Sequence, residues 1–341
     1  MKIKIGGKQI GDGEPCFIIA EAGSNHNRDF KLALGLIDAA VEANVDAVKF
    51  QTYSAETLYS RETPIFPGES TPPYEVVKKY EIPRNWQPEL ASYAQKKGII
   101  FLSSPFDYKA VNELAAVGIQ AYKIASSEIN DLPFLKYIAS QGKPIILSTG
   151  MCHLADIQLA VKAIKEVGNQ DIILLQCTAV YPTNVEEINL RAMDTLKNAF
   201  HLPVGFSDHS LGIFVPIAAV ARGATIVEKH FTLSRKFKGP DHSFALEPHE
   251  LRKMVTAIRE VERSLGSPIK EPTAGEQKKM MLSRRSIISA KDISKGTIIS
   301  GEMLIIKRPA LGISPEYLEI VIGRRAKKNI KKDEPITWDK I

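Results

Sequence analysis

Residues 99–128 read IIFLSSPFDYKAVNELAAVGIQAYKIASSE, and this stretch decides the fold. The apolar and β-branched residues at 99–103 predict a strand, and the helical spacing of apolar residues over 108–117 predicts a helix. Gly118 marks the end of that helix, and residues 121–124 predict the next strand. A strand, a helix and a second strand in this order form a parallel β–α–β unit.

The same unit recurs along most of the chain. Strands are expected over residues 17–20, 46–50, 99–103, 121–124, 144–147, 171–177, 203–206 and 224–228. Helices are expected over residues 30–43, 86–97, 108–117, 132–141, 154–166, 189–200, 212–222 and 248–265. These consecutive units match the ~250-residue size of a (β/α)8 TIM barrel, an α/β fold. An open, doubly wound sheet is the alternative, and the unbroken run of units favours a closed barrel.

Three segments lie outside these units. Residues 2–10 alternate apolar and polar side chains around Gly6-Gly7, which predicts a hairpin at the bottom of the barrel. Residues 52–83 are a long, proline-rich connection after the second strand, which predicts a lid over the carboxyl ends of the strands. Residues 266–280 have the composition of a linker.

We therefore assign residues 1–265 to a catalytic barrel with its N-terminal hairpin, 266–280 to a linker and 281–341 to a small second domain. Within the second domain, Lys291–Ser300 resembles Lys328–Thr337, which predicts a mainly β, pseudo-symmetric fold. A core of this size is marginal alone, so we expect the domain to dock on another surface.

Composition excludes several classes of protein. Hydrophobic residues make up 44% and charged residues 25% of the 341, which is typical of a globular protein. The longest nearly apolar run, Ile213–Ala221, is too short for a transmembrane helix, which needs ~20 residues. With no signal peptide and three cysteines without metal-site spacing, we expect a cytoplasmic protein with reduced thiols. Lys and Arg outnumber Asp and Glu by 13 to 7 over Met281–Ile341, but interleaved acids argue against nucleic-acid binding.

Polar residues stand at every predicted strand end, which is where (β/α)8 barrels carry their active sites. Lysines with short hydroxyls suit a phosphate and a carboxylate; these residues are Lys49, Lys123, Ser104, Ser126, Ser148 and Ser207. His209 and His230 end adjacent strands and suit a hard or borderline divalent cation. Carboxyl groups for acid–base chemistry and polar recognition come from Glu21, Glu128, Asp208 and Asp241.

Structural interpretations compete with these functional ones. Two histidines alone are a weak signal for a metal, and their placement on neighbouring strands strengthens it. Lys229 follows Glu228 and is interpreted as its structural ion-pair partner. His26 is expected at the surface, while the position of His242 is left open.

The motifs at these positions identify a family. They are Ile18-Ile-Ala-Glu-Ala-Gly-Ser-Asn-His26, Val48-Lys-Phe-Gln-Thr52, Ser103-Ser-Pro-Phe106, Tyr122-Lys-Ile-Ala-Ser-Ser-Glu128, Leu147-Ser-Thr-Gly-Met151, Gln176-Cys-Thr178, Tyr181-Pro-Thr183, Gly205-Phe-Ser-Asp-His-Ser210, Glu228-Lys-His-Phe231, Gly239-Pro-Asp-His242 and Lys307-Arg-Pro309. From about residue 15 to the end, the chain resembles the sialic acid synthase family, which includes legionaminic and pseudaminic acid synthases and a spore-coat polysaccharide branch.

The resemblance implies a (β/α)8 barrel followed by an antifreeze-like (SAF) β-clip domain. It implies that phosphoenolpyruvate condenses with an N-acetylated amino-sugar aldehyde, giving a nine-carbon α-keto acid and phosphate. His209 and His230 would bind Mn²⁺ or Mg²⁺, and Glu128 would be the acid or base beside the metal. Phosphoenolpyruvate would be held by Lys49, Ser104, Lys123, Ser126, Ser148 and Ser207. The sugar would be contacted by Glu21, Tyr181, Asp241 and, from the SAF domain of a partner subunit in a domain-swapped homodimer, Arg308.

Two departures from the family pattern concern the substrates. Ala179 stands where some members place an Asn near the phosphate, and Pro67–Ser70 lacks the Asn that some sialic acid synthases carry in the lid. We expect N-acetylmannosamine as the sugar, with 2,4-diacetamido-2,4,6-trideoxymannose as the main alternative. A Schiff-base aldolase using Lys123 or Lys49, and a saccharide-binding protein without activity, are the alternative functions.

Overall fold

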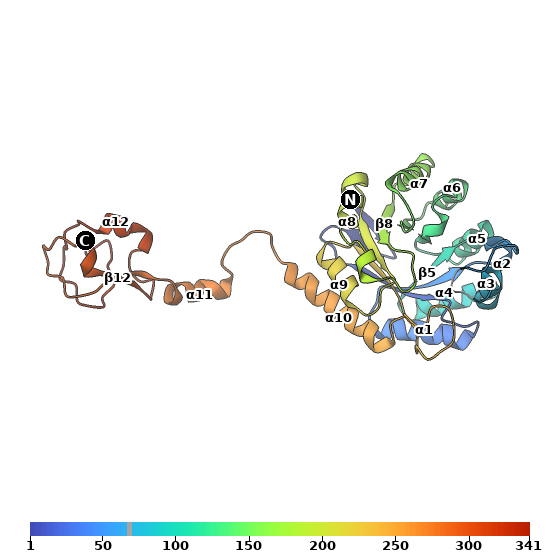
Figure 1. Cartoon of the computed structure of the whole chain (residues 1–341), viewed down its shortest axis with the longest axis horizontal. Helices are drawn as coiled ribbons and strands as arrows, with labels where there is room; N and C mark the ends of the chain where they lie inside the picture. Colours follow the sequence, from blue (N-terminus) through green and yellow to red (C-terminus); the bar gives the residue numbers. More distant parts are fainter. Residues whose placement is uncertain (67–69) are drawn as a thin grey trace. The chain divides into compact units, whose positions relative to one another are not determined.

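Eight parallel strands close into a barrel in the order β10-β3-β4-β5-β6-β7-β8-β9. They are β3 (Phe17–Gly23), β4 (Ala47–Thr52), β5 (Ile100–Pro105), β6 (Tyr122–Ile124), β7 (Ile145–Ser148), β8 (Ile172–Cys177), β9 (Val204–Asp208) and β10 (Ile226–His230). In this computed structural model, which describes residues 1–66 and 70–341, helices surround the strands as a ring (Figure 1). The predicted (β/α)8 barrel is confirmed.

The barrel helices follow the predicted order with small shifts at their ends. They are α1 (Phe30–Glu42), α4 (Gln87–Lys96), α5 (Tyr108–Ala116), α6 (Leu132–Ala139), α7 (Leu154–Glu166), α8 (Ala192–Phe200), α9 (Phe214–Ala221) and α10 (Pro248–Leu265). Helix α8 begins at Ala192 rather than at 189, because Asn189 has a left-handed backbone with φ of 53°. None of the helices in the described ranges is long and apolar enough to cross a membrane.

Local sequence signals place the helix ends. The Asp29 side chain accepts hydrogen bonds from the backbone N–H groups of Lys31 and Leu32, which caps α1. Asp107 caps α5 in the same way through Ala110. Gly118 follows α5 with φ of 76°, a conformation that costs a residue with a Cβ more than it costs glycine. These signals fix where each helix turns back toward the barrel.

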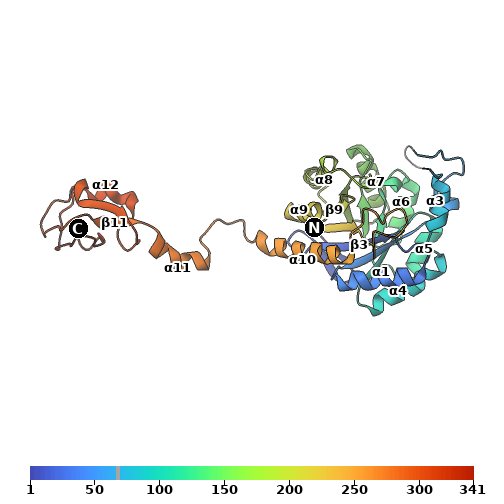
Figure 2. The same cartoon turned by 60° about the horizontal axis from the view of Figure 1, so that its bottom comes forward.

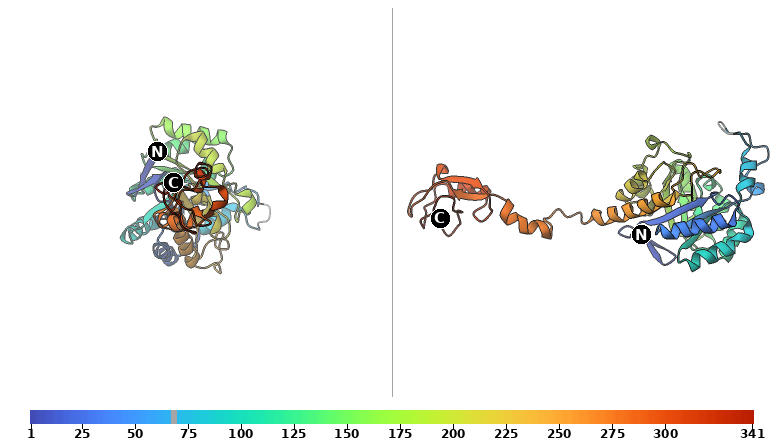
Figure 3. Two further views of the ribbon diagram at one scale, coloured as in Figure 1. Left: turned by 90° about the vertical axis from the view of Figure 1, so that its left-hand side faces the viewer. Right: turned by 90° about the horizontal axis from the view of Figure 1, so that it is seen from below.

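The predicted N-terminal hairpin is formed by β1 (Lys2–Ile5) and β2 (Lys8–Gly11), which pair antiparallel. Its apolar side chains are buried in the main core, and its tip at Gly6 packs on Ile100, the first residue of β5. Lys8 also pairs with Asp46, which precedes β4. The hairpin therefore covers the amino-terminal ends of the strands, away from the lid segment (Figures 2 and 3).

The predicted lid contains two short helices, α2 (Ala55–Leu58) and α3 (Pro73–Tyr80), and a 3₁₀ turn at Arg84–Trp86 follows it. Glu56 joins the helices, because its carboxylate receives bonds from Arg61 at 2.8 Å and from Tyr74. Most of the Pro67–Ser70 stretch, with Pro67, Gly68 and Glu69, lies outside the described residues.

The second unit, Ser267–Ile341, contains a small antiparallel sheet of β11 (Ser286–Ser289) and β12 (Leu304–Lys307). The two similar segments meet across a local dyad: Ile293 and Ile330, at equivalent places in the repeat, exchange two backbone hydrogen bonds of 2.8 Å. Helix α12 (Leu318–Val321) completes the unit. The segment predicted as a linker is partly helical, since α11 spans Ala274–Ser283.

Candidate active site

The carboxyl ends of the strands carry a buried polar surface. Strand pairing places Glu21 opposite Lys49 on one side and opposite His230 on the other. On the next strand pair, β4 with β5, Gln51 lies opposite Ser104. These side chains converge because parallel strands in a closed barrel end at the same rim.

Two lysines and two carboxylates form a connected set of charges at the barrel mouth. Lys49 Nζ lies 2.8 Å from Glu21 Oε2 and 3.6 Å from Glu228 Oε1, and it donates to Ser104 Oγ at 3.1 Å. Lys123 Nζ lies 3.5 Å from the same Glu228 oxygen. All four charged groups are at most 6% exposed. We call Glu21, Lys49, Lys123 and Glu228 the charge quartet.

Burial and pairing shift the pKa values of the quartet in opposite directions. Burial raises the pKa of Glu21 to about 7, although Lys49 opposes the shift. Burial alone would lower the pKa of Lys49, but Glu21 and Glu228 hold it above the ordinary value. For Lys123, burial outweighs Glu228 and lowers the pKa. Glu228 keeps a lowered pKa despite burial, because both lysines favour its charged form.

Hydroxyl groups surround the lysines. Among the described residues, Ser148 Oγ is buried without a hydrogen-bond partner, and so is Glu228 Oε2. Ser207 Oγ lies 3.5 Å from Glu228, while Ser126 Oγ accepts the backbone N–H of Gly150 at 2.9 Å. The unsatisfied hydroxyl of Ser148 and the two buried ammonium groups favour an oxygen-rich anion as the ligand, whereas Glu228 Oε2 can only accept a hydrogen bond.

His209 and His230 lie together at the ends of β9 and β10. Their ring centroids are 5.5 Å apart, and His209 Nδ1 donates to the carbonyl of Thr178 at 2.8 Å, which leaves Nε2 free to coordinate. Burial lowers the pKa of His209 to about 4 and the pKa of His230 well below its usual value. Both rings are therefore neutral near pH 7, the form that binds cations.

The histidines fit a divalent cation as partial ligands. His230 Nδ1 is buried without a hydrogen-bond partner within the described part of the chain and lies 3.8 Å from Asp241 Oδ2. No group of three or more His, Cys, Asp and Glu side chains in residues 1–66 and 70–341 is arranged to hold a metal. Two imidazoles therefore leave further coordination positions to water or substrate.

A cavity of about 470 Å³ lies beside the histidines and beneath the lid. Three of the predicted acid–base and sugar-contact residues line this cavity: Glu128, Tyr181 and Asp241. The fourth, Glu21, belongs to the charge quartet. The Tyr181 ring is 4.0 Å from the His209 ring, and burial raises the pKa of Asp241 to about 6. Burial also raises the pKa of Glu128. Arg308 belongs to the second unit, where its side chain is exposed.

Lys229 does form a structural ion pair, as the sequence suggested, but its partner is not the neighbouring Glu228. Lys229 Nζ instead donates to Asp208 Oδ2 at 2.6 Å and to the Ser210 carbonyl, so Asp208 is occupied by a structural pair. Glu228 belongs to the charge quartet, and sequence reasoning missed it. Strand alternation could have found it, because Glu228 and His230 are two residues apart and share the inner face.

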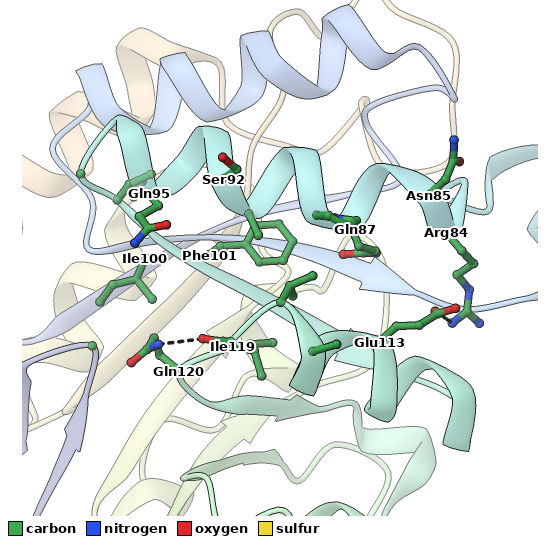
Figure 4. A pocket seen from close by; sticks show the side chains of 18 residues that line it. Arg84, Asn85, Gln87, Ser92, Gln95, Ile100, Phe101, Glu113, Ile119 and Gln120 are labelled. Atoms are coloured by element: carbon green, nitrogen blue, oxygen red, sulfur yellow. Dashed lines mark hydrogen bonds and ion pairs between the residues drawn. The ribbon is translucent and has the colours of Figure 1, made fainter.

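A larger cleft lies elsewhere, on the outer wall of the barrel between α4 and α5 (Figure 4). Its floor is formed by apolar residues of and around β5, including Phe101 and Ile119. Its charged residues are already paired, since Arg84 donates to Glu113 at 2.8 Å. None of the predicted site residues lines this cleft.

The fold and this polar rim define a (β/α)8-barrel enzyme. A model of the NeuB family matches residues 36–270, and one of the SAF domain matches residues 284–341. The chain is 44% identical to the N,N'-diacetyllegionaminic acid synthase of Campylobacter jejuni over 94% of its length and 98% of the relative. It is 41% identical to the same enzyme of Legionella pneumophila, covering 99% and 98%.

Solved structures agree with this assignment. The N-acetylneuraminic acid (sialic acid) synthetase of Leptospira borgpetersenii superposes with a TM-score of 0.75 at 39% identity, covering 82% of this chain and 95% of that one. The chain belongs to the NeuB family and carries a SAF domain. The enzyme class implied by its motifs, a phosphoenolpyruvate-dependent condensing transferase of the sialic acid synthase type, is confirmed.

The ion pair between Lys229 and Asp208 lies outside the charge quartet, and its structural role can be tested. Lys229→Met should lower the free energy of unfolding by ~3–5 kcal/mol, because Asp208 would be left buried without its partner. The double variant Asp208→Leu/Lys229→Met should recover most of that loss. Urea unfolding followed by circular dichroism measures both. Equal stability of the single variant and the wild type would contradict a structural pair.

Proposed function

We propose that the enzyme condenses phosphoenolpyruvate with an N-acetylated mannose-type aldehyde, giving a nine-carbon α-keto acid and phosphate. One observation carries the proposal: the buried quartet and its hydroxyls lie on the same barrel rim as a pair of neutral histidines. An anion with phosphate and carboxylate groups suits the first, and a metal-assisted carbonyl suits the second.

Phosphoenolpyruvate would be bound through Lys49 and Lys123, whose ammonium groups oppose the negative charge of the phosphate and carboxylate. The serines would complete its shell through Ser104, Ser126, Ser148 and Ser207. Ser148 Oγ, unpartnered among the described atoms, is then satisfied by substrate. Close to Ser126 and Gly150, Ala179 offers only a methyl group where an Asn amide would add a donor.

His209 and His230 would hold the divalent metal, Mn²⁺ or Mg²⁺, which when bound supplies Lewis acidity to the aldehyde oxygen. Carbon C3 of phosphoenolpyruvate forms a bond to the aldehyde carbon as the aldehyde C=O π bond breaks, and the aldehyde oxygen takes up a proton to become a hydroxyl. Water adds at C2. The tetrahedral intermediate then loses phosphate by C–O cleavage. Glu128 would take the proton from this water, since its raised pKa brings the carboxylate closer to neutral pH.

The metal assignment predicts a specific loss. His209→Ala and His230→Ala should each abolish bound Mn²⁺ and turnover while the fold is kept, because each removes one of two imidazole ligands. Elemental analysis and phosphate release from phosphoenolpyruvate measure the two effects. His249→Ala, which alters an exposed histidine on α10, is the matched control. Activity that survives EDTA but is trapped by borohydride with pyruvate would instead favour the Schiff-base aldolase.

The lid supports a choice between sugars. On its side of the cavity, Leu58, Val76 and Val77 form an apolar wall beside three tyrosines, Tyr53, Tyr59 and Tyr80. The Tyr53 hydroxyl is already bonded to Ser24 Oγ at 2.8 Å. Other polar lid residues are engaged elsewhere, because Arg61 and Tyr74 both bond to Glu56. The apolar lid residue Ile65 does not line the cavity and is half exposed. An apolar wall favours a methyl group and offers a hydroxymethyl group few partners. We therefore infer that 2,4-diacetamido-2,4,6-trideoxymannose is preferred over N-acetylmannosamine, the sugar expected from sequence.

This preference predicts a kinetic difference. With saturating phosphoenolpyruvate and Mn²⁺, kcat/KM for the trideoxy sugar should exceed that for N-acetylmannosamine by at least ~10-fold. Val77→Ser should reduce the ratio, because a hydroxyl replaces part of the apolar wall. Ile65→Ser, on an exposed lid residue outside the cavity, should leave the ratio unchanged. A clear preference of the wild type for N-acetylmannosamine would restore the sequence-based choice.

We also propose a homodimer in which Arg308 reaches the sugar site of the partner subunit. The exposed guanidinium of Arg308 in a small basic domain supports this arrangement. Inactive Arg308→Ala and inactive Lys123→Ala subunits, when mixed, should recover part of the activity, because one site in each mixed dimer has both residues. Phosphate release measures the recovery. Proven mixed dimers without any activity would argue against a site shared between subunits.

A further inference from the structure

The loop after β10 carries Asp241 to the edge of the sugar cavity, and a buried histidine follows it directly. We propose that His242, Asn27 and Thr232 are positioning residues that hold Asp241 in place for the sugar. The inference rests on the proposed function, because Asp241 is there assigned to the sugar.

His242 is fully buried and uses both ring nitrogens. Nδ1 lies 2.6 Å from Thr232 Oγ1, and Nε2 lies 3.2 Å from Asn27 Oδ1. In the neutral tautomer whose Nε2–H donates to the Asn27 amide oxygen, Nδ1 accepts from the Thr232 hydroxyl, which lies closer to this nitrogen than to the Ser234 carbonyl at 3.2 Å. The ring therefore joins the end of β10 to the loop between β3 and α1.

The β3–α1 loop is held in a costly conformation where it meets His242. Asn27 and Arg28 both have a left-handed backbone, with φ of 49° and 56°. Such residues cost ~1 kcal/mol or more each and persist only where surrounding contacts impose them. One such contact comes from His26, whose Nδ1 accepts the backbone N–H of Arg28 at 3.0 Å. The predicted surface location of His26 is wrong, since it is 1% exposed.

The same two loops enclose Asp241. Its Oδ2 accepts the backbone N–H of Ser24 at 3.2 Å and lies 3.8 Å from His230 Nδ1. A Cβ on Gly23 would come within 2.8 Å of that carboxylate oxygen. Further along, a Cβ on Gly239 would come within 2.7 Å of the His242 ring and 2.8 Å of Asn27 Oδ1. The loops thus fit together too closely for Asp241 to move independently of His242.

This geometry separates the clamp from the phosphoenolpyruvate side of the site. Within the described residues, the side chains of His242, Asn27 and Thr232 make no hydrogen bond to either lysine of the quartet. They meet the cavity through their loop neighbours, Asp241 next to His242 and Ser24, whose carbonyl accepts the backbone N–H of Asn27 at 3.1 Å. Loss of the clamp should therefore affect the sugar and spare the anion. A displacement of ~1 Å at a substrate contact can cost ~100-fold in rate.

The test uses full-length enzyme with Mn²⁺ and the sugar that the wild type prefers. His242→Ala should raise the KM for the sugar by ~10–100-fold, and change the KM for phosphoenolpyruvate and the bound Mn²⁺ by less than about twofold. His249→Ala, on the exposed neighbouring helix, should change none of these values. In an Asp241→Ala background, His242→Ala should add no further loss, because its effect passes through Asp241.

A second pair of variants covers the case in which His242→Ala fails to fold. Thr232→Ser keeps the hydroxyl that donates to Nδ1 and should behave like the wild type, whereas Thr232→Val should reproduce the rise in sugar KM. Equal losses for sugar and phosphoenolpyruvate, or additive losses in the Asp241→Ala background, would overturn the clamp alone. Wild-type enzyme that releases no phosphate with either sugar would overturn the proposed function and the clamp together.

Discussion

The charge quartet is the constraint around which the rest of the site is arranged. A buried ammonium group without a partner is far too costly to keep, so two lysines at a barrel mouth require two carboxylates. Glu21 on β3 and Glu228 on β10 supply them. The neighbouring strands carry other polar side chains of the rim, with Lys49 on β4 opposite Glu21 and Ser207 on β9 opposite Glu228. The quartet is neutral as a whole, yet it presents Lys49 and Lys123 to any anion that enters. Pairing thus makes the lysines stable in the absence of substrate and available in its presence.

Most of the barrel was predictable because its signals are local. Apolar runs of strand length, helical spacing and glycine after the helix, as at Gly118, are written within a few residues of one another. The gathering of polar side chains at the strand ends was also predictable, since a closed parallel barrel collects them at one rim. The failure at Lys229 concerned direction along a strand, where each step of one residue reverses the face. Alternation from His230 would have separated Glu228 from Lys229 without any structural knowledge.

The remaining features depend on contacts between segments far apart in the chain. His26 and His242 lie 216 positions apart in sequence and stabilise two loops that meet only when β10 pairs with β3. A polar side chain on a loop has the composition of a surface residue, and nothing in its neighbours reveals that a second loop will cover it. The lid wall is similar, because Val76 and Val77 become cavity residues only when α3 lies over the strand ends. The composition of segment 52–83 therefore suggested Arg61 and Tyr74 as polar contacts for the sugar. In the structure, both side chains bond to Glu56 instead.

The site thus has two parts, one on the barrel strands and one on the loops, and substitutions in the two parts should have different effects. Lys49, Lys123 and the histidines stand on barrel strands, so altering them disturbs a rigid core and the chemistry together. Val77, Asp241 and His242 stand on connections that the barrel supports without depending on them for closure. A change in the lid can thus alter the proposed sugar site while the positions proposed for the anion and the metal stay fixed. This separation gives a physical reason to look for the determinants of sugar choice in the loops rather than at the strand ends.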